Sequence, residues 1–204
     1  MRGIFFCCLG LLWPGLGFSA AEADSKTAIV KVFVDQYFID DADFDPSKSF
    51  ELAARWPLKP ASQLMLETSV SSNFGAETKE ECDNTGCFVL TLDTFELLVG
   101  GTYRFSEDGI LGQQWLNFVR GGLLFYDLEV ELEETFYELK PKGTDRSEDS
   151  GNGFYAGIGG DFSWRDFPLT WELLYRSRLD ALGDSSAPFN VNSLSLGIGM
   201  RFGF

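Results

Sequence analysis

The sequence contains no histidine among its 204 residues, and this absence excludes several kinds of chemistry. Ser-His and Asp-His catalysis both need an imidazole as general base. A catalytic pair of carboxylates remains conceivable, with Glu96 and Glu172 as candidates. Structural ion pairs are the simpler interpretation of these two residues. We therefore expect no enzymatic activity.

Positive charge is also scarce, because 16 Lys and Arg residues stand against 31 Asp and Glu, for a net charge of −15. Such a chain is unsuited to nucleic acid, whose phosphates need Lys and Arg. Long apolar runs are missing as well: after the N-terminus, no stretch approaches the roughly 18 apolar residues that indicate a membrane helix. If the protein spans a bilayer, it does so with strands.

The N-terminus has the features of a secretory signal. Arg2 precedes an apolar run over residues 4–18, and small residues follow up to Ala23. We expect residues 1–23 to be a signal peptide, cleaved after Ala23 or Ala21, and residues 24–204 to form one domain. A membrane anchor is the alternative, but the run is shorter than a spanning helix needs and Pro14 interrupts it.

Only two of the four cysteines lie outside this signal, Cys82 and Cys87 in "CDNTGC". An exported protein meets an oxidising compartment, so a short loop disulfide is predicted. On the chain-entropy model it would stabilise the fold by about 2 kcal/mol. A metal site is the alternative, but it would need about four ligands.

The dominant pattern is alternation of apolar and polar residues, interrupted by Gly, Pro, Asp and Asn. Eight runs are predicted as strands: 27–38, 48–57, 62–74, 88–105, 114–132, 153–165, 168–180 and 191–204. The connections alternate between short and long, as in outer-membrane barrels with tight periplasmic turns and longer external loops. The sequence therefore predicts an all-β protein, an eight-stranded antiparallel up-and-down transmembrane β-barrel with its C-terminus in the periplasm.

Each strand has one apolar and one polar row. In run 168–180, Trp171 and Leu173 share one row, whereas Glu172, Arg176 and Arg178 share the other. A Lys or Arg facing lipid costs about 2–4 kcal/mol at mid-bilayer, so the polar rows should face inward. Run 114–132 is apolar on both rows around Arg120, and only this cost assigns Arg120 inward.

The predicted inward charges balance. The positive residues are Lys31, Arg55, Arg104, Arg120, Arg176 and Arg201. The negative residues are Asp35, Glu51, Glu67, Glu96, Asp161 and Glu172. Buried charges persist only when paired, and eight strands leave an interior that side chains can fill. We expect a closed, salt-bridged interior without an aqueous pore.

The last strand, "SLSLGIGMRFGF", has an apolar row that includes Ile198, Met200, Phe202 and Phe204. In a closed barrel this strand pairs with the first one, and lipid covers its apolar row.

Most of the net negative charge lies in the four long connections, which would face the exterior. "DDADFD" contains Asp40, Asp41, Asp43 and Asp45 but fails as an EF-hand, because Pro46 and Leu52 occupy the required Gly and Glu positions. We expect no cofactor, although weak Ca²⁺ or Mg²⁺ binding at these acidic loops stays open.

Across essentially all of its mature length, the chain resembles the small eight-stranded outer-membrane barrels of the outer-membrane-protein-A-like and opacity-like group. The resemblance rests on "YFIDDADFD", "RWPLKPASQLMLETS", "NGFYAGIGGDFSW", "WELLYRS" and the C-terminal strand. It implies that Phe204, with Phe202, Met200 and Ile198 upstream, is the signal read by the barrel-assembly machinery. It also implies a bacterial outer-membrane protein.

Three functions follow from these observations. The first is a monomeric, non-enzymatic barrel in contact with outer-membrane lipid and lipopolysaccharide, acting as an envelope component or in surface interaction through acidic external loops. The second is a small channel or ligand-transfer barrel, and the third is a soluble periplasmic lipocalin-like binder. The paired polar rows and the terminal aromatic strand favour the first.

Overall fold

The structure is a computed structural model. It describes residues 26–39, 42–59, 62–78, 81–82, 86–105, 110, 115–136, 142–165, 167–179, 181 and 190–203. The expected signal peptide, Asp40, Asp41 and Phe204 lie outside these residues, so their predictions stay predictions. Among the described residues, no helix is long and apolar enough to cross a membrane.

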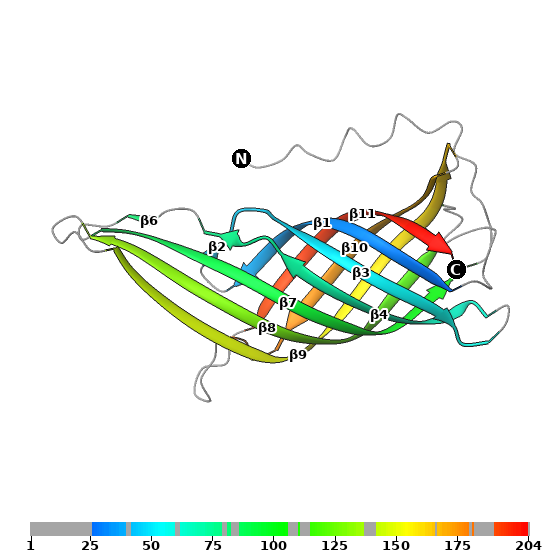
Figure 1. The fold of residues 1–204 in the computed structure, drawn as a ribbon, viewed down its shortest axis with the longest axis horizontal. Coiled ribbons are helices and arrows are strands. Elements are labelled where there is room, and N and C mark those ends of the chain that lie inside the picture. The colour runs from blue at the N-terminus through cyan, green and yellow to red at the C-terminus, as the bar shows by residue number, and fades with distance from the viewer. Residues whose placement is uncertain are drawn as a thin grey trace.

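The described residues form eleven β-strands, eight of them long (Figure 1). The strands are β1 (Thr27–Ile39), β2 (Ala42–Asp43), β3 (Ser47–Pro57), β4 (Leu64–Asn73), β5 (Ala76–Glu77), β6 (Glu81–Cys82), β7 (Gly86–Arg104), β8 (Phe118–Phe136), β9 (Lys142–Trp164), β10 (Phe167–Arg178) and β11 (Val191–Gly203). The long strands pair antiparallel in the order β11-β10-β9-β8-β7-β4-β3-β1, and β11 pairs with β1 to close the sheet. The prediction of an all-β, eight-stranded, antiparallel barrel is confirmed.

The closing pair explains the composition of the last strand. β11 runs beside β1 from Asn192 to Gly203, so neither strand is left as an edge of the barrel. Ile198 and Phe202 lie on the outside, with 57% and 49% of their surfaces exposed, and Met200 lies between them on the same row. The opposite row places Ser193 and Ser195 in the interior.

Alternation along the strands separates an apolar wall from a polar interior. On β1, Val32 and Val34 are exposed, whereas Lys31 and Asp35 are buried. β3, β4, β7, β10 and β11 follow the predicted faces in the same way. An exposed apolar exterior around buried charges reverses the arrangement of a water-soluble protein.

The structure corrects the prediction for the long connection over 133–152. β8 continues to Phe136 and β9 begins at Lys142, so most of this segment is strand. The predicted strand 114–132 ends within "DLEVELEETF", whereas β8 continues four residues farther, to the end of this segment. Strand pairing can continue here because this segment lies beyond the apolar wall. Its charged outer row stays in water and loses no hydration. The predicted long connection over 75–87 likewise contains β5 and β6, and both pair with β7.

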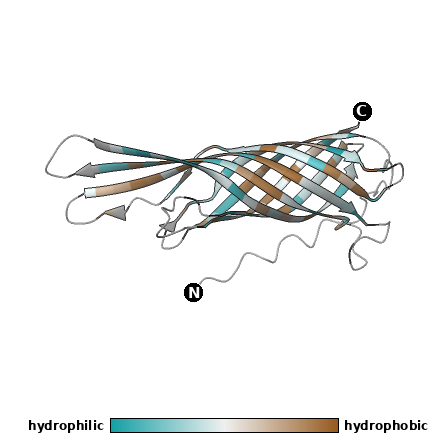
Figure 2. Cartoon of the chain, turned by 90° about the horizontal axis from the view of Figure 1, so that it is seen from below, coloured by the Kyte–Doolittle hydropathy of each residue, from teal (hydrophilic) through white to brown (hydrophobic). Residues whose placement is uncertain are grey.

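β7, β8 and β9 extend beyond the barrel at the end away from the C-terminus (Figures 1 and 2). Pairing of β4 with β7 ends at Phe95, and pairing of β10 with β9 ends at Gly153. We call the three-stranded part beyond these pairs, residues 86–94, 127–136 and 142–152, the projecting ribbon.

The interior also contains an apolar cluster, which corrects the expectation of an interior made of ion pairs. Leu98, Leu124 and Leu174 are fully buried on inner rows, and the cluster continues to Leu92 and Leu128 at the base of the projecting ribbon. Alternation from Glu96, Arg120 and Glu172 already places Leu98, Leu124 and Leu174 on inward rows, but the prediction took only the charged members of these rows into account.

Candidate functional site

The centre of the barrel interior is a buried cluster of two cations and three carboxylates. Arg120 donates to Glu51 at 3.0 Å and also donates to Glu67 and Glu172. The Lys31 ammonium donates to Glu51 at 3.0 Å and to Glu172 at 2.7 Å. The side chains of these five residues are completely buried. The assignment of Arg120 to the interior is thus confirmed.

A second group lies toward the projecting ribbon. Arg176 donates to Asp35 at 3.2 Å, and its Nε lies 3.2 Å from a carboxylate oxygen of Glu96. Arg178 donates from its Nε to Glu96 at 2.7 Å. Arg176 also lies 3.7 Å from a carboxylate oxygen of Glu51, and this contact links the second group to the central cluster.

Arg178 is a member of the network that the predicted set omitted. It is fully buried, and it raises the interior cations to seven against six carboxylates. The signal was present in the sequence, since alternation along run 168–180 places Arg178 on the same row as Glu172 and Arg176.

The third group lies at the opposite end of the interior, where Asp161 contacts three arginines. Arg104 donates to Asp161, Arg201 lies 3.5 Å from it, and Arg55 lies 3.9 Å from it. Arg55 also donates to Glu67 at 2.5 Å, and Glu67 contacts Arg120. Each of the twelve predicted residues therefore has an ionic partner, and all eight long strands contribute to one connected network.

The two carboxylates considered as a catalytic pair, Glu96 and Glu172, have different ionic partners. Glu172 contacts Arg120 and Lys31, whereas Glu96 contacts Arg176 and Arg178. Each carboxylate is held by its own cations, an arrangement that neutralises buried charge.

Aromatic rings stack between the guanidinium groups and glycines of the wall, a feature that the sequence analysis missed. The Arg176 guanidinium lies 5.2 Å from the Phe33 ring centroid, and a Cβ on Gly197 would lie 2.3 Å from that ring. Arg55 lies 4.7 Å from the centroid of Phe118, which covers Gly159 in the same way. A glycine on the neighbouring strand thus leaves room for a ring that supports a buried cation.

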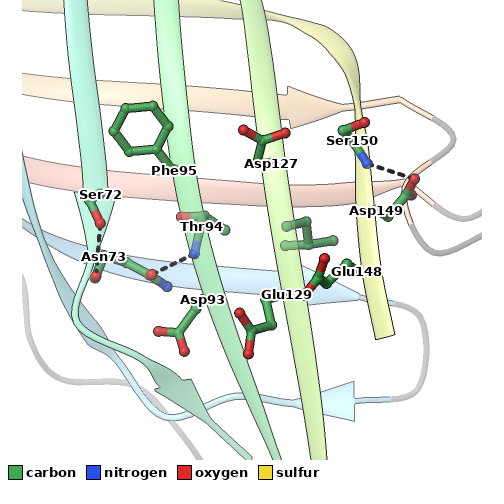
Figure 3. Close-up of a pocket in the computed structure, with 11 residues that line it drawn as sticks. Ser72, Asn73, Asp93, Thr94, Phe95, Asp127, Glu129, Glu148, Asp149 and Ser150 are labelled. Atoms are coloured by element: carbon green, nitrogen blue, oxygen red, sulfur yellow. Dashed lines mark hydrogen bonds between the residues drawn. The ribbon is translucent and has the colours of Figure 1, made fainter. Parts of the chain in front are cut away.

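A groove of about 720 Å³ lies where the barrel meets the projecting ribbon (Figure 3). Its lining residues come from β4, β7, β8 and β9: Ser72, Asn73, Asp93, Thr94, Phe95, Asp127, Leu128, Glu129, Glu148, Asp149 and Ser150. Asn73 ends β4 by donating to the Leu92 carbonyl at 2.8 Å and accepting from the Thr94 amide at 2.7 Å. Five carboxylates make this groove strongly negative.

Arg146 is the cation beside this groove, 2.5 Å from Glu129 and 3.2 Å from Glu148. Within the described part of the chain, no group of three or more acidic or cysteine side chains is placed to hold a metal ion. Weak Ca²⁺ or Mg²⁺ binding at "DDADFD" stays a prediction, because Asp40 and Asp41 lie outside that part.

Cys82 and Cys87 form the predicted disulfide, with an S–S distance of 2.07 Å. The two residues oppose each other where β6 pairs with β7. The disulfide therefore attaches a short strand to the edge of the projecting ribbon.

The closed wall and filled lumen define the class of this protein, a small eight-stranded antiparallel β-barrel. No protein-family model and no curated protein matches the chain. Among solved structures, it is similar to Ail, the attachment invasion locus protein of Yersinia pestis, at 14% sequence identity and a TM-score of 0.48. That alignment covers 88% of this chain and 99% of Ail.

Two further barrels are similar to the chain. Neisserial surface protein A shares 11% identity over 87% of this chain and 97% of its own, with a TM-score of 0.41. The N-terminal β-barrel domain of OprF from Pseudomonas aeruginosa shares 14% identity over 86% of this chain and 97% of that chain, with a TM-score of 0.39.

Proposed function

We propose that the protein is a monomeric integral outer-membrane barrel that is closed to ions and acts at the cell surface through its projecting ribbon. The observation that carries this proposal is the buried ion-pair network, to which every long strand contributes. Such a network ties opposite walls together and leaves no continuous aqueous path through paired side chains. The barrel then serves as a rigid membrane anchor for the projecting ribbon.

The apolar wall supports insertion into a membrane. Leu52, Leu123 and Leu196 each expose between 46% and 59% of their surface on the outside of different strands. The contiguous apolar surface of such a wall is larger than the apolar patches that monomeric soluble proteins expose to water. A lipocalin-like binder would need the opposite arrangement, with its apolar rows inside.

The proposed orientation places the short turns and the C-terminus in the periplasm and the projecting ribbon outside. Short periplasmic turns and long external extensions are the usual asymmetry of these barrels. The acidic groove at the base of the ribbon would then lie just above the outer leaflet, where anionic lipopolysaccharide repels it unless divalent cations intervene. The ribbon would therefore stand away from the membrane and meet other molecules.

Two measurements test this proposal. The mature chain, folded into lipid vesicles, is expected to change its gel mobility only after boiling, because a closed barrel resists unfolding by detergent alone. In intact cells, trypsin is expected to cleave at Arg146 in the ribbon while the rest of the barrel is protected. A protein that appears in the soluble periplasmic fraction, or a ribbon cut only after the outer membrane is opened, would contradict it.

A further inference from the structure

Three arginines converge on one carboxylate at the end of the interior opposite the projecting ribbon. Arg104 donates to Asp161, and the Nε of Arg201 lies 3.5 Å from the same carboxylate. Nη1 of Arg55 lies 3.9 Å from it. The three arginines belong to β7, β11 and β3, and no two of these strands are neighbours in the barrel. We call Arg55, Arg104 and Arg201, which reach Asp161 from three sides of the lumen, the arginine group.

Arg55 has hydrogen-bond donors that the described residues do not satisfy. Its Nε donates to Glu67 at 2.5 Å, but neither of its two Nη groups has a hydrogen-bond acceptor among the described residues. The side chain is only 1% exposed, so bulk water does not hydrate these groups. A buried, charged donor without an acceptor is costly, and the unsatisfied edge of this guanidinium therefore points to a ligand with acceptor oxygens.

The two carboxylates near Arg55 are already shared with other donors. Glu67 also accepts from Arg120, and Asp161 is shared by the whole arginine group. The Nε of Arg104 also has no hydrogen-bond acceptor among the described residues. This end of the lumen therefore presents donors in excess, and a further anion would satisfy them.

The arginine group can be reached from one end of the barrel. The side chains of Arg104 and Arg201 are 17% and 13% exposed. The inner rows beside the group carry short residues, which are Thr27, Ser163, Thr170, Gly199 and Gly203. Farther along the lumen, the buried cluster around Arg120 closes the interior. An anion that enters at this end therefore stops at the arginine group and does not cross the barrel.

We propose that the arginine group binds a phosphate group. A phosphate presents oxygens in several directions, which suits guanidinium groups that come from three sides of the lumen, and each guanidinium can donate two parallel hydrogen bonds to it. A carboxylate offers two oxygens in one plane. Asp161 competes for the same donors, so its charge limits the affinity. In the proposed orientation this end faces the periplasm, where phosphate occurs as the free ion and in the lipid headgroups of the inner leaflet.

The binding test uses the folded mature chain in maltoside micelles, which contain no phosphate. Equilibrium dialysis with radiolabelled inorganic phosphate is expected to show saturable binding of one phosphate per chain. The net charge of −15 repels anions from the rest of the surface, so saturable binding reports a specific site. Absence of saturable binding in micelles would overturn the proposal.

Matched variants locate the site. Arg104 belongs to the arginine group, whereas Arg165 is exposed in the turn between β9 and β10 at the same end. We expect R104M to weaken phosphate binding by at least about tenfold, because charge-assisted hydrogen bonds are lost, and R165M by less than about twofold. A boiling-dependent mobility shift shows that each variant is folded. Equal losses in the two variants would reduce the interaction to surface charge and overturn the proposal.

Replacing the competing carboxylate separates a binding role from a structural one. D161N keeps the size of the side chain and removes its charge, so we expect phosphate to bind about tenfold more tightly. Loss of a merely structural ion pair would not raise the affinity for an anion. Weaker binding by folded D161N would overturn the proposal, and R104M decides if D161N does not fold.

The same dialysis in phospholipid nanodiscs identifies the source of the phosphate group. A site for free phosphate is expected to bind it in nanodiscs as in micelles. A site for a lipid headgroup is expected to exclude added phosphate in nanodiscs and to retain phospholipid in micelles, which R104M releases. Exclusion of phosphate without lipid that depends on Arg104 would overturn the proposal. The tests of the proposed function do not involve the arginine group, so that function stands if this inference fails.

Discussion

Among single residues, the main energetic question is whether the ion pairs of the interior offset the cost of removing their charges from water. Each buried ion loses its hydration, and breaking a buried pair leaves the remaining charge uncompensated. Arg120 neutralises more buried negative charge than a single pair would, because Glu51, Glu67 and Glu172 all contact it.

Replacing Arg120 is expected to destabilise the barrel strongly. In R120M the three carboxylates keep Lys31, Arg55 and the more distant Arg176 as nearby cations but lose the one cation that contacts all three, so we expect the free energy of unfolding to fall by about 3–5 kcal/mol. Urea unfolding in lipid vesicles, followed by gel mobility, measures the change. The matched control is R146M, which breaks a pair whose arginine side chain is 56% exposed and should cost less than about 1 kcal/mol. Equal effects would contradict the central role of Arg120.

Two neighbouring glycines on β7 offer a second comparison. A Cβ on Gly100 would lie 2.1 Å from the backbone oxygen of Gly121, whereas the nearest atom to a Cβ on Gly101 would be 3.5 Å away. We expect G100A to lower the free energy of unfolding by about 1–3 kcal/mol, because backbone atoms must shift. G101A should change it by less than about 0.5 kcal/mol. The same urea titration measures both free energies of unfolding. A larger decrease in G101A than in G100A would contradict the close approach of β7 and β8 at Gly100.

The direction of a side chain could be predicted from the sequence where the residue is charged, because a charged side chain is stable on only one face of the wall. Lys31 and Glu67 could be placed because a charge facing lipid is costly. Phe33 and Phe118 share inward rows with Lys31 and Arg120, so alternation also places them inside. Which glycine and arginine each ring contacts depends on other strands and could not be predicted.

At the scale of elements, the lengths of β8 and β9 distinguish this barrel. Glu129 and Glu148 oppose each other near the base of the ribbon, and pairing continues outward to Thr135 and Lys142. This part is held by β-pairing and by the apolar row that includes Val130 and Leu132, rather than by the interior network. The barrel and the ribbon should therefore be separable.

Shortening the ribbon is expected to leave the barrel intact. Replacing residues 130–147 by Asn-Gly would join Glu129 and Glu148 with a two-residue hairpin turn, which suits directly opposed residues. The variant should keep its boiling-dependent mobility shift and lose surface cleavage by trypsin at the ribbon. Failure to fold would show that the ribbon is required for barrel formation.

At the scale of the whole molecule, closure of β11 onto β1 removes the last open edge of the barrel, and the charge network fills its interior. The ion pairs among these seven cations and six carboxylates reach across the barrel, for example from Arg55 on β3 to Asp161 on β9, four strands away.

We expect no ion conductance from the folded protein. Side chains that are paired across the lumen would have to separate before an ion could pass, and each separation exposes an uncompensated charge. Recording in a planar bilayer, with a porin as the positive control, measures this. Discrete current steps from the purified, folded chain would contradict the closed interior and favour the channel alternative.

The sequence by itself determined the eight-stranded alternation, the inward direction of the twelve charges and the cysteine pair, because each depends on local period or on a cost that one residue carries. The partners of each charge, the contacts between the buried apolar residues and the extension of β8 and β9 into a ribbon became known only from the fold. These depend on register between strands far apart in the chain, and alternation within one strand carries no information about register.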